Sequence, residues 1–238
     1  MCMKDERFGY ASVMGALHKT SKLPNQDAYL VKRLKKGTIL VVSDGMGSHT
    51  HSEIGAKAVC KSVSKAIQFW IEKECDDIRL LIPILHALWG VEIFPFPRNE
   101  CGATCLFAFV ANCGKLYLGQ LGDGSVFFDI GDGISLLKDK DDEFANLTVG
   151  INNIKSFADW SLSCFDIVDK NVKICLMTDG VSETLVENKR NDFVNLVWKR
   201  VAEKNNVIER NNLIFKLLAQ WNPVNAGDDR TLISYEKK

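Results

Sequence analysis

The stretch Val41-Val42-Ser43-Asp44-Gly45 ends an apolar run with an aspartate and a glycine. The same order recurs in Leu121-Gly122-Asp123-Gly124 and in Leu176-Met177-Thr178-Asp179-Gly180, and the acidic turn Gly227-Asp228-Asp229-Arg230-Thr231 precedes the last apolar run. A strand anchors the side chain at its end on a rigid element, and glycine lets the backbone turn and expose its carbonyl oxygen. The pattern therefore predicts carboxylates presented on rigid elements by several distant parts of the chain.

Strand-like and helical patterns alternate in blocks around these motifs. Runs rich in β-branched residues predict strands near 10–15, 28–34, 38–42, 103–111, 115–121, 125–130, 133–137, 156–163, 172–177 and 231–235. Apolar residues at helical spacing predict helices at 53–74, 76–89, 191–204 and 209–221. The strands between 103 and 137 have short glycine-containing connections, which are typical of an antiparallel meander. The order predicts an α+β fold, a four-layer α-β-β-α sandwich of two mainly antiparallel sheets flanked by helix pairs.

The composition is that of an ordinary globular protein. With 238 residues, of which 46% are hydrophobic and 25% charged, we expect a single domain over residues 1–238. Thirty basic residues balance thirty acidic ones, so we expect no nucleic acid and no membrane as partner. The apolar stretches are shorter than the roughly 20 residues that a spanning helix needs. The eight cysteines are scattered and read as reduced thiols, so we expect a cytoplasmic location.

The repeated aspartates suit divalent metal chemistry. Hard cations such as Mg²⁺ and Mn²⁺ prefer oxygen ligands, and two of them about 3.5–4 Å apart hold a hydrolytic water and a phosphate together. Cysteine and histidine at metal-ligand spacing are absent, so zinc is a less natural choice. Asp-Gly is also a common hairpin signal, and we assign Asp132, between two strand-like runs, to a turn alone. For the other Asp-Gly pairs both interpretations remain open at this point.

These motifs resemble, in order and over nearly the whole chain, those of the metal-dependent protein phosphatases of type 2C. Met46-Gly47 is more similar to bacterial members than to eukaryotic ones. The segments that carry the resemblance are Asn25-Gln26-Asp27-Ala28, Val42-Ser43-Asp44-Gly45-Met46-Gly47-Ser48-His49, Gly55-Ala56, Gly102-Ala103-Thr104, Leu121-Gly122-Asp123-Gly124-Ser125, Thr178-Asp179-Gly180-Val181 and Asp228-Asp229-Arg230-Thr231.

The resemblance implies a β-sandwich with two Mg²⁺ or Mn²⁺ ions at one end, and a third, weaker ion. By position, Asp44 would bridge two ions, the Gly45 carbonyl would bind one of them, and Asp179 and Asp228 would complete the first site. Asp123, together with Asp179, matches the weaker third site of bacterial-type members.

The resemblance also implies a reaction. A water activated between the ions held by Asp44, Asp179 and Asp228 would hydrolyse phosphoserine or phosphothreonine, with no phosphoenzyme. The expected partner is a phosphorylated protein whose serine/threonine kinase the enzyme opposes. Asp27 would orient metal-bound waters, and Gln26 and Asp229 would lie just outside the ligands.

The sequence departs from the family pattern around the expected phosphate. Lys22 stands where many members have an arginine, and a lysine binds phosphate as a point charge without the bidentate fork. Lys22 is therefore a candidate phosphate-binding residue or a solvated loop lysine. Gln26 replaces a frequent glutamate, and Met46 replaces a histidine that serves as general acid in some eukaryotic members.

The roles of the histidines stay open. His18 and His49 are each either assistants of the site or loop residues, whereas His86, inside an apolar helical run, is expected to be a structural histidine with its hydrogen bonds satisfied. The segment at about 138–170 takes the place of the family's variable flap, and here it is short.

Two other functions fit the same residues. Lys22 and Gln26 motivate a catalytically weak or inactive relative that uses the fold as a binding module. The other is a metal-dependent hydrolase of small phosphorylated molecules. The aspartates Asp44, Asp123, Asp179 and Asp228 favour an active phosphatase.

Overall fold

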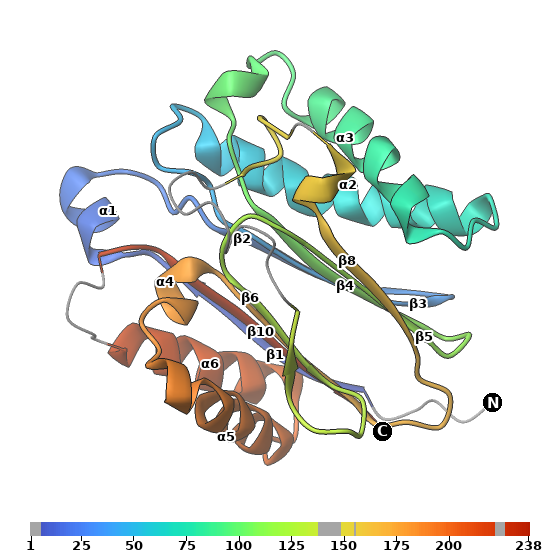
Figure 1. Cartoon of the computed structure of the whole chain (residues 1–238). Coiled ribbons are helices and arrows are strands. Elements are labelled where there is room, and N and C mark those ends of the chain that lie inside the picture. The colour runs from blue at the N-terminus through green and yellow to red at the C-terminus, as the bar shows by residue number, and fades with distance from the viewer. Residues whose placement is uncertain (1–5, 138–148, 155, 222–226) are drawn as a thin grey trace.

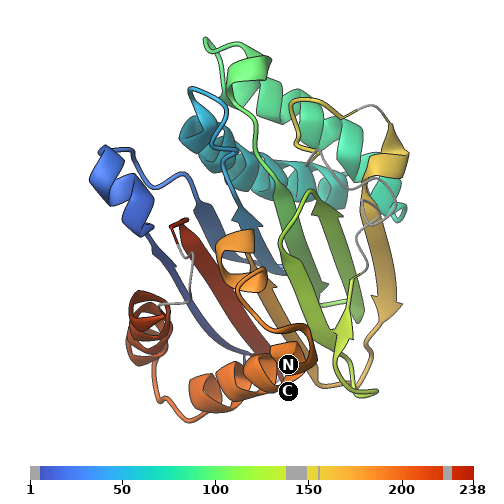
Figure 2. The same ribbon diagram turned by 60° about the vertical axis from the view of Figure 1, so that its left-hand side comes forward.

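The protein is a sandwich of two sheets between two layers of helices (Figure 1). The computed structural model describes residues 6–137, 149–154, 156–221 and 227–238. Helices α2 (Ser52–Glu72) and α3 (Leu81–Glu92) cover one sheet, and α5 (Arg190–Ala202) and α6 (Val207–Gln220) cover the other, as the turned view in Figure 2 also shows. The predicted four-layer fold is confirmed.

Both sheets have five strands, and all neighbouring strands are antiparallel. The first sheet contains, in spatial order, β1 (Glu6–Val13), β10 (Arg230–Lys237), β9 (Val172–Met177), β6 (Ser125–Asp129) and β7 (Ser135–Leu136). The second contains β2 (Ala28–Leu34), β3 (Gly37–Ser43), β4 (Cys105–Ala111), β5 (Lys115–Leu121) and β8 (Ser161–Asp166). The last strand therefore lies inside its sheet, between β1 and β9.

Strand β3 shows why the layers stack in this order. All seven of its residues are buried. Leu40 and Val42 belong to the core between the two sheets, whereas Ile39 and Val41 belong to the core beneath α2 and α3. Because successive side chains of a strand point to opposite faces, a strand that is apolar throughout needs a covering layer on each side. Strand β9 alternates in the same way between the inter-sheet core and the core beneath α5 and α6.

Short helices make several of the connections. They are α1 (Ala16–Ser21), α4 (Asp179–Ser182) and the 3₁₀ turns Ile78–Leu80, Arg98–Glu100, Phe157–Asp159 and Glu187–Lys189. Among the described residues, no helix combines the length and the apolar character needed to cross a membrane.

Three predicted elements differ from the structure. The strand predicted at 10–15 is β1, which begins at Glu6 and ends at Val13, and it is followed by the unpredicted helix α1 from Ala16. The helix predicted at 76–89 is a 3₁₀ turn followed by α3, which places Pro83 in the first turn, where a missing N–H breaks no helical hydrogen bond. The strand predicted at 156–163 begins only at Ser161.

The predicted meander is wrong as a single sheet. Strands β4 and β5 pair in the second sheet, whereas β6 and β7 lie in the first. The chain crosses between the sheets at Gly122-Asp123-Gly124, where both glycines have positive φ angles of 81° and 98°. Such backbone angles favour glycine, so this Asp-Gly sequence is a crossover and not a hairpin turn.

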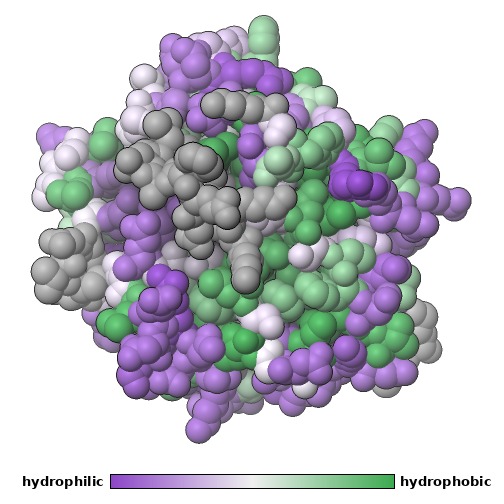
Figure 3. Space-filling model, viewed as in Figure 1, coloured by the Kyte–Doolittle hydropathy of each residue, from purple (hydrophilic) through white to green (hydrophobic). Residues whose placement is uncertain are grey.

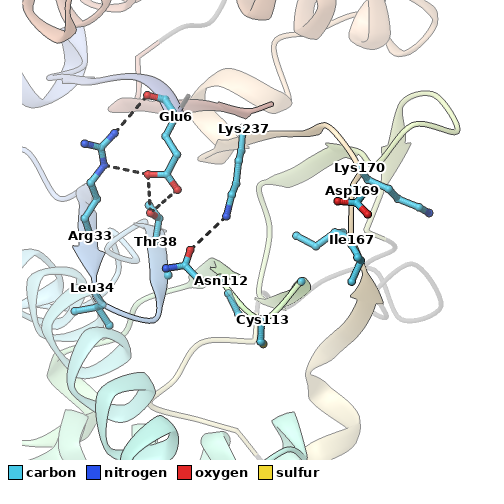
Figure 4. A pocket seen from close by; sticks show the side chains of 14 residues that line it. Glu6, Arg33, Leu34, Thr38, Asn112, Cys113, Ile167, Asp169, Lys170 and Lys237 are labelled. Carbon is cyan, nitrogen blue, oxygen red and sulfur yellow. Dashed lines mark hydrogen bonds and ion pairs between the residues drawn. The ribbon is translucent and has the colours of Figure 1, made fainter. Parts of the chain in front are cut away.

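The ends of the sandwich differ in character. At the end where β3 begins, a cavity of about 520 Å³ opens between the sheets (Figure 4). On its wall, Glu6 accepts hydrogen bonds from Arg33 and Thr38, and Lys237 reaches Asn112 at 3.4 Å. In the surface view of Figure 3, hydrophilic residues make up most of the outer edge of the molecule. The motif aspartates are not part of this cavity, because Asp44 follows the opposite end of β3.

The surroundings of His86 disfavour its protonated form. Its ring lies 6.1 Å from that of Trp160, and its buried Nε2 has no hydrogen-bond partner among the described residues, so the expectation of a satisfied histidine is wrong. Burial, with a smaller contribution from the charge of Arg98, lowers the pKa of His86 to about 4. In the unfolded chain His86 therefore becomes protonated near pH 6.5, whereas in the folded protein it becomes protonated only near pH 4.

We predict that, as the pH drops from about 6.5 to about 4, the free energy of unfolding of the wild type falls relative to that of His86→Leu, because the other titrating groups are common to both proteins. Urea unfolding of both proteins across this range, with a chelator present, measures the difference. Parallel pH profiles for the two proteins would contradict the prediction.

Candidate metal centre

Four segments bring carboxylates to one end of the sandwich. Asp44 follows β3, Asp123 lies in the crossover between β5 and β6, Asp179 opens α4 directly after β9, and Asp228 lies just before β10. Carboxylate oxygens of Asp123, Asp179 and Glu183 lie within 4.8 Å of one another. Because β3 and β9 belong to different sheets, the packing of the two sheets is what assembles the cluster.

The backbone around Asp44 is fixed by Thr104. The Thr104 hydroxyl accepts a hydrogen bond from the Asp44 N–H (2.9 Å), and the Thr104 N–H donates to the Asp44 carbonyl (2.8 Å). The Ser43 hydroxyl donates to the Thr104 carbonyl at 2.6 Å. The next residue, Gly45, lies so close to the backbone of Gln26 and Ser52 that an added Cβ would meet carbonyl oxygens at 2.7 Å. This turn therefore requires glycine.

Asp27 is held from the other sheet. The Thr178 hydroxyl donates to Asp27 Oδ2 at 2.9 Å and accepts a hydrogen bond from the Thr231 N–H at 3.0 Å. Asp27 Oδ1 is buried and has no hydrogen-bond partner among the described residues. Burial raises the pKa of Asp27 to about 8, and the charges of Asp229 and Asp179 act in the same direction. A buried carboxylate with an unused oxygen is suited to a cation or to a water that a cation holds.

The carboxyl groups of Asp44, Asp228 and Glu183 also resist ionisation. Burial raises the pKa of Asp44 well above its ordinary value, and the nearby charges of Asp27, Asp179 and Asp228 raise it further. The pKa of Asp228 is raised by desolvation and by Asp179, and that of the exposed Glu183 by desolvation and by Asp179 and Asp228. Like charges brought this close are stabilised by divalent cations, and the oxygen-only donor set fits Mg²⁺ or Mn²⁺.

Asp229 is engaged by the segment that connects β1 to β2. It is 2% exposed, its Oδ1 accepts the Gly15 N–H (2.7 Å), and its Oδ2 accepts the Gln26 N–H (2.6 Å). His18 Nδ1 lies 2.7 Å from the same Oδ2. Although ligand atoms of His18, Asp228 and Asp229 lie within 4.8 Å of one another, hydrogen bonds occupy both oxygens of Asp229. Asp228 is thus the better placed of the two aspartates for a metal ion.

The residues that depart from the family pattern, and the neighbouring His49, differ in their surroundings. Lys22 is exposed at the end of α1, with a φ of 55°. The Gln26 side chain is 7% exposed and approaches Gly47, and its backbone carbonyl accepts the Gly45 N–H at 3.1 Å. Met46 lies against Gly150, where an added Cβ would meet the sulfur at 2.6 Å. His49 Nδ1 lies 2.6 Å from the carbonyl of Asn99.

Two further sequence interpretations can be compared with the structure. Asp132 lies between β6 and β7, where Asp129 Oδ1 accepts the N–H groups of Gly131 (2.8 Å) and Gly133 (3.3 Å), so its assignment to a turn is confirmed. Part of the flap-like segment, 138–148 and residue 155, lies outside the described residues. Its described part packs beside the site, because the Ile151 N–H donates to the Ala103 carbonyl at 2.9 Å.

The sequence interpretation gave no individual role to Thr104, Thr178 or Glu183. The two threonines stand inside the quoted motifs, and a hydroxyl next to a strand-end aspartate is the signal that could have identified Thr178. Glu183 is four residues after Asp179 and shares its helical face, which spacing alone could have suggested had α4 been predicted.

We predict that Asp44→Asn stabilises the metal-free protein by about 0.5–2 kcal/mol near neutral pH, because it removes one charge from the cluster. The same substitution should shrink the rise in melting temperature that Mn²⁺ produces in the wild type. Thermal unfolding with a chelator and with Mn²⁺ measures both effects. The matched control is Asp132→Asn, an Asp-Gly turn outside the cluster, which should leave both unchanged. Destabilisation of the metal-free protein by Asp44→Asn would contradict the prediction.

Comparison with known proteins adds to this geometry. A search of curated protein sequences gives no match. Among solved structures, a bacterial serine phosphatase bearing a point mutation has a TM-score of 0.66 at 14% identity, covering 99% of this chain and 100% of that one. The catalytic domain of the serine/threonine phosphatase PstP, in complex with two manganese ions, has a TM-score of 0.62 at 16% identity, covering 98% of each chain. RsbX in complex with magnesium has a TM-score of 0.63 at 15% identity, covering 98% of this chain and 96% of that one. The family model described as protein phosphatase 2C matches residues 14–217, and the chain belongs to the protein phosphatase 2C family.

Proposed function

We propose that the protein is a metal-dependent phosphatase that hydrolyses phosphoserine or phosphothreonine in protein substrates. The observation that carries the proposal is the cluster of partly or fully desolvated carboxylates, drawn from both sheets, whose pKa values are raised by one another. An uncompensated cluster of this kind destabilises the fold, so its presence indicates that cations complete it. Mn²⁺ in PstP and Mg²⁺ in RsbX support the same choice of ion.

Two ions would be held by Asp44, the Gly45 carbonyl, Asp179 and Asp228. A weaker third ion would be held by Asp123 together with Asp179. Bound there, the ions would supply an activated water and positive charge beside the phosphate.

The protein's own groups orient these ligands. Thr104 fixes the backbone of Asp44, and Thr178 fixes one oxygen of Asp27 while the other stays available. Groups held by such contacts need little reorganisation when the substrate binds. Lys22, on an exposed turn, would attract the phosphate as a point charge.

We further propose that residues 1–238 form one phosphatase domain, that its substrate is a phosphoprotein modified by a serine/threonine kinase, and that it acts in the cytoplasm. The family match over 14–217 and the full-length structural coverage support the single domain. Thirty basic and thirty acidic residues support a partner other than nucleic acid.

We predict Mn²⁺-dependent hydrolysis of p-nitrophenyl phosphate that Asp44→Ala lowers by about a thousandfold, since the ions contribute several kcal/mol to the transition state. The control Asp132→Ala should retain wild-type activity. Equal background rates for wild type and Asp44→Ala would favour an inactive binding module. Faster turnover of metabolite phosphates than of phosphothreonine peptides would contradict the proposed substrate class.

We predict that Lys22→Ala raises KM for a phosphothreonine peptide and that Lys22→Arg lowers it, because a guanidinium can bind phosphate with two hydrogen bonds. Steady-state kinetics over a range of peptide concentrations separate KM from kcat. Lys19→Ala, on the same exposed helix, is the control. An unchanged KM in Lys22→Ala would show that Lys22 is a solvated lysine only.

A further inference from the structure

Helix α1 lacks the hydrophobic anchor that usually holds a helix in place. None of its six residues is buried, and Leu17 is 64% exposed. Its N-cap is Gly15, which offers no side-chain cap. The segment from Gly15 to Gln26 leaves the first sheet at β1 and enters the second at β2, so its position depends on polar contacts with its surroundings.

Asp229 makes three of these contacts. Its two oxygens receive the N–H of Gly15 at 2.7 Å, the N–H of Gln26 at 2.6 Å and Nδ1 of His18 at 2.7 Å. A carboxylate accepts hydrogen bonds, so Nδ1 carries the proton here. The three donors come from both ends of the Gly15–Gln26 segment and from α1 between them. The single buried carboxylate of Asp229 therefore ties the whole segment together.

The contacts continue into the candidate metal centre. The Gln26 carbonyl accepts the N–H of Gly45, whose own carbonyl is a proposed ligand. On the other side, Asp229 follows Asp228 in the chain, and the Asp229 N–H donates to Asp228 Oδ1 at 2.8 Å. The Leu17 N–H donates to the Gly227 carbonyl at 3.0 Å. Displacement of Asp229 would therefore move two proposed ligands, the Asp228 carboxylate and the Gly45 carbonyl.

We propose that His18 and Asp229 form a clamp that holds the Gly15–Gln26 segment against the Asp228 turn and sets the positions of the Asp228 and Gly45 ligands. Both are positioning residues, because they act on the metal centre through other groups. The inference rests on the proposed function, since it concerns the same centre, but it assigns His18 a role that the motifs leave open.

The first test follows the clamp without metal or substrate. In the chelator-treated protein, hydrogen exchange of peptides covering residues 15–26 should be at least about tenfold faster in His18→Leu than in the wild type. His18→Asn, whose amide can replace the Nδ1 donor, should restore most of the protection. Thr20→Ala is the matched control, because the Thr20 hydroxyl bonds only within α1. Unchanged exchange in His18→Leu would overturn the clamp.

The second test concerns the metal centre. Calorimetric titration with Mn²⁺ should give an affinity about tenfold or more weaker in His18→Leu and Asp229→Asn, with recovery in His18→Asn. Faster exchange with unchanged Mn²⁺ affinity would overturn the positioning role and leave a structural contact. If the wild type binds Mn²⁺ and shows the expected losses but hydrolyses no phosphate, the clamp stands and the proposed phosphatase activity fails. If the wild type binds no Mn²⁺, the metal centre and the positioning role both fail.

Discussion

The packing of the two sheets against each other is the interaction on which the rest of the structure depends. Apolar side chains from the inner faces interlock between the sheets, and β3 and β9 contribute Leu40, Val42, Ile174 and Leu176. Burial of such side chains is the main favourable contribution to folding, and it is tolerant of sequence change provided that the pattern of apolar residues is kept. This tolerance explains how chains with only 14–16% identity share the same layers.

This packing also gathers groups that repel one another. Asp44 and Asp27 lie on the side of the second sheet, and Asp179 and Asp228 on the side of the first, so the cluster exists only while the sheets are in contact. The pKa values of Asp27, Asp44 and Asp228 are raised because these carboxyl groups lose hydration and lie near other negative charges. Stability supplied by the inter-sheet core offsets this repulsion in the absence of cations.

Neutral groups hold the charged ones in place. The Thr104 hydroxyl accepts a hydrogen bond from the Asp44 backbone. The Thr178 hydroxyl donates to the Asp27 carboxylate and the Gly15 N–H to that of Asp229, while the basic residue Lys22 is exposed at the end of α1. A neutral donor orients a carboxylate without cancelling its attraction for a metal ion. Asp229, with both oxygens occupied, illustrates the difference between a carboxylate that organises a site and one that remains open to a ligand.

The sequence by itself determined the layered fold and the strand-end positions of Asp44, Asp123, Asp179 and Asp228, because apolar periodicity and Asp-Gly turns are local signals. The resemblance of its ordered motifs indicated the family. The sequence also distinguished the turn residue Asp132 from the aspartates expected to bind metal. Only the tertiary structure decided that Gly122–Gly124 crosses between sheets and that Glu183 joins the cluster. It likewise revealed that His18 pairs with Asp229, 211 residues away in the chain. These features depend on which distant segments come into contact when the sheets pack. The spacing of residues within one segment carries no information about such contacts.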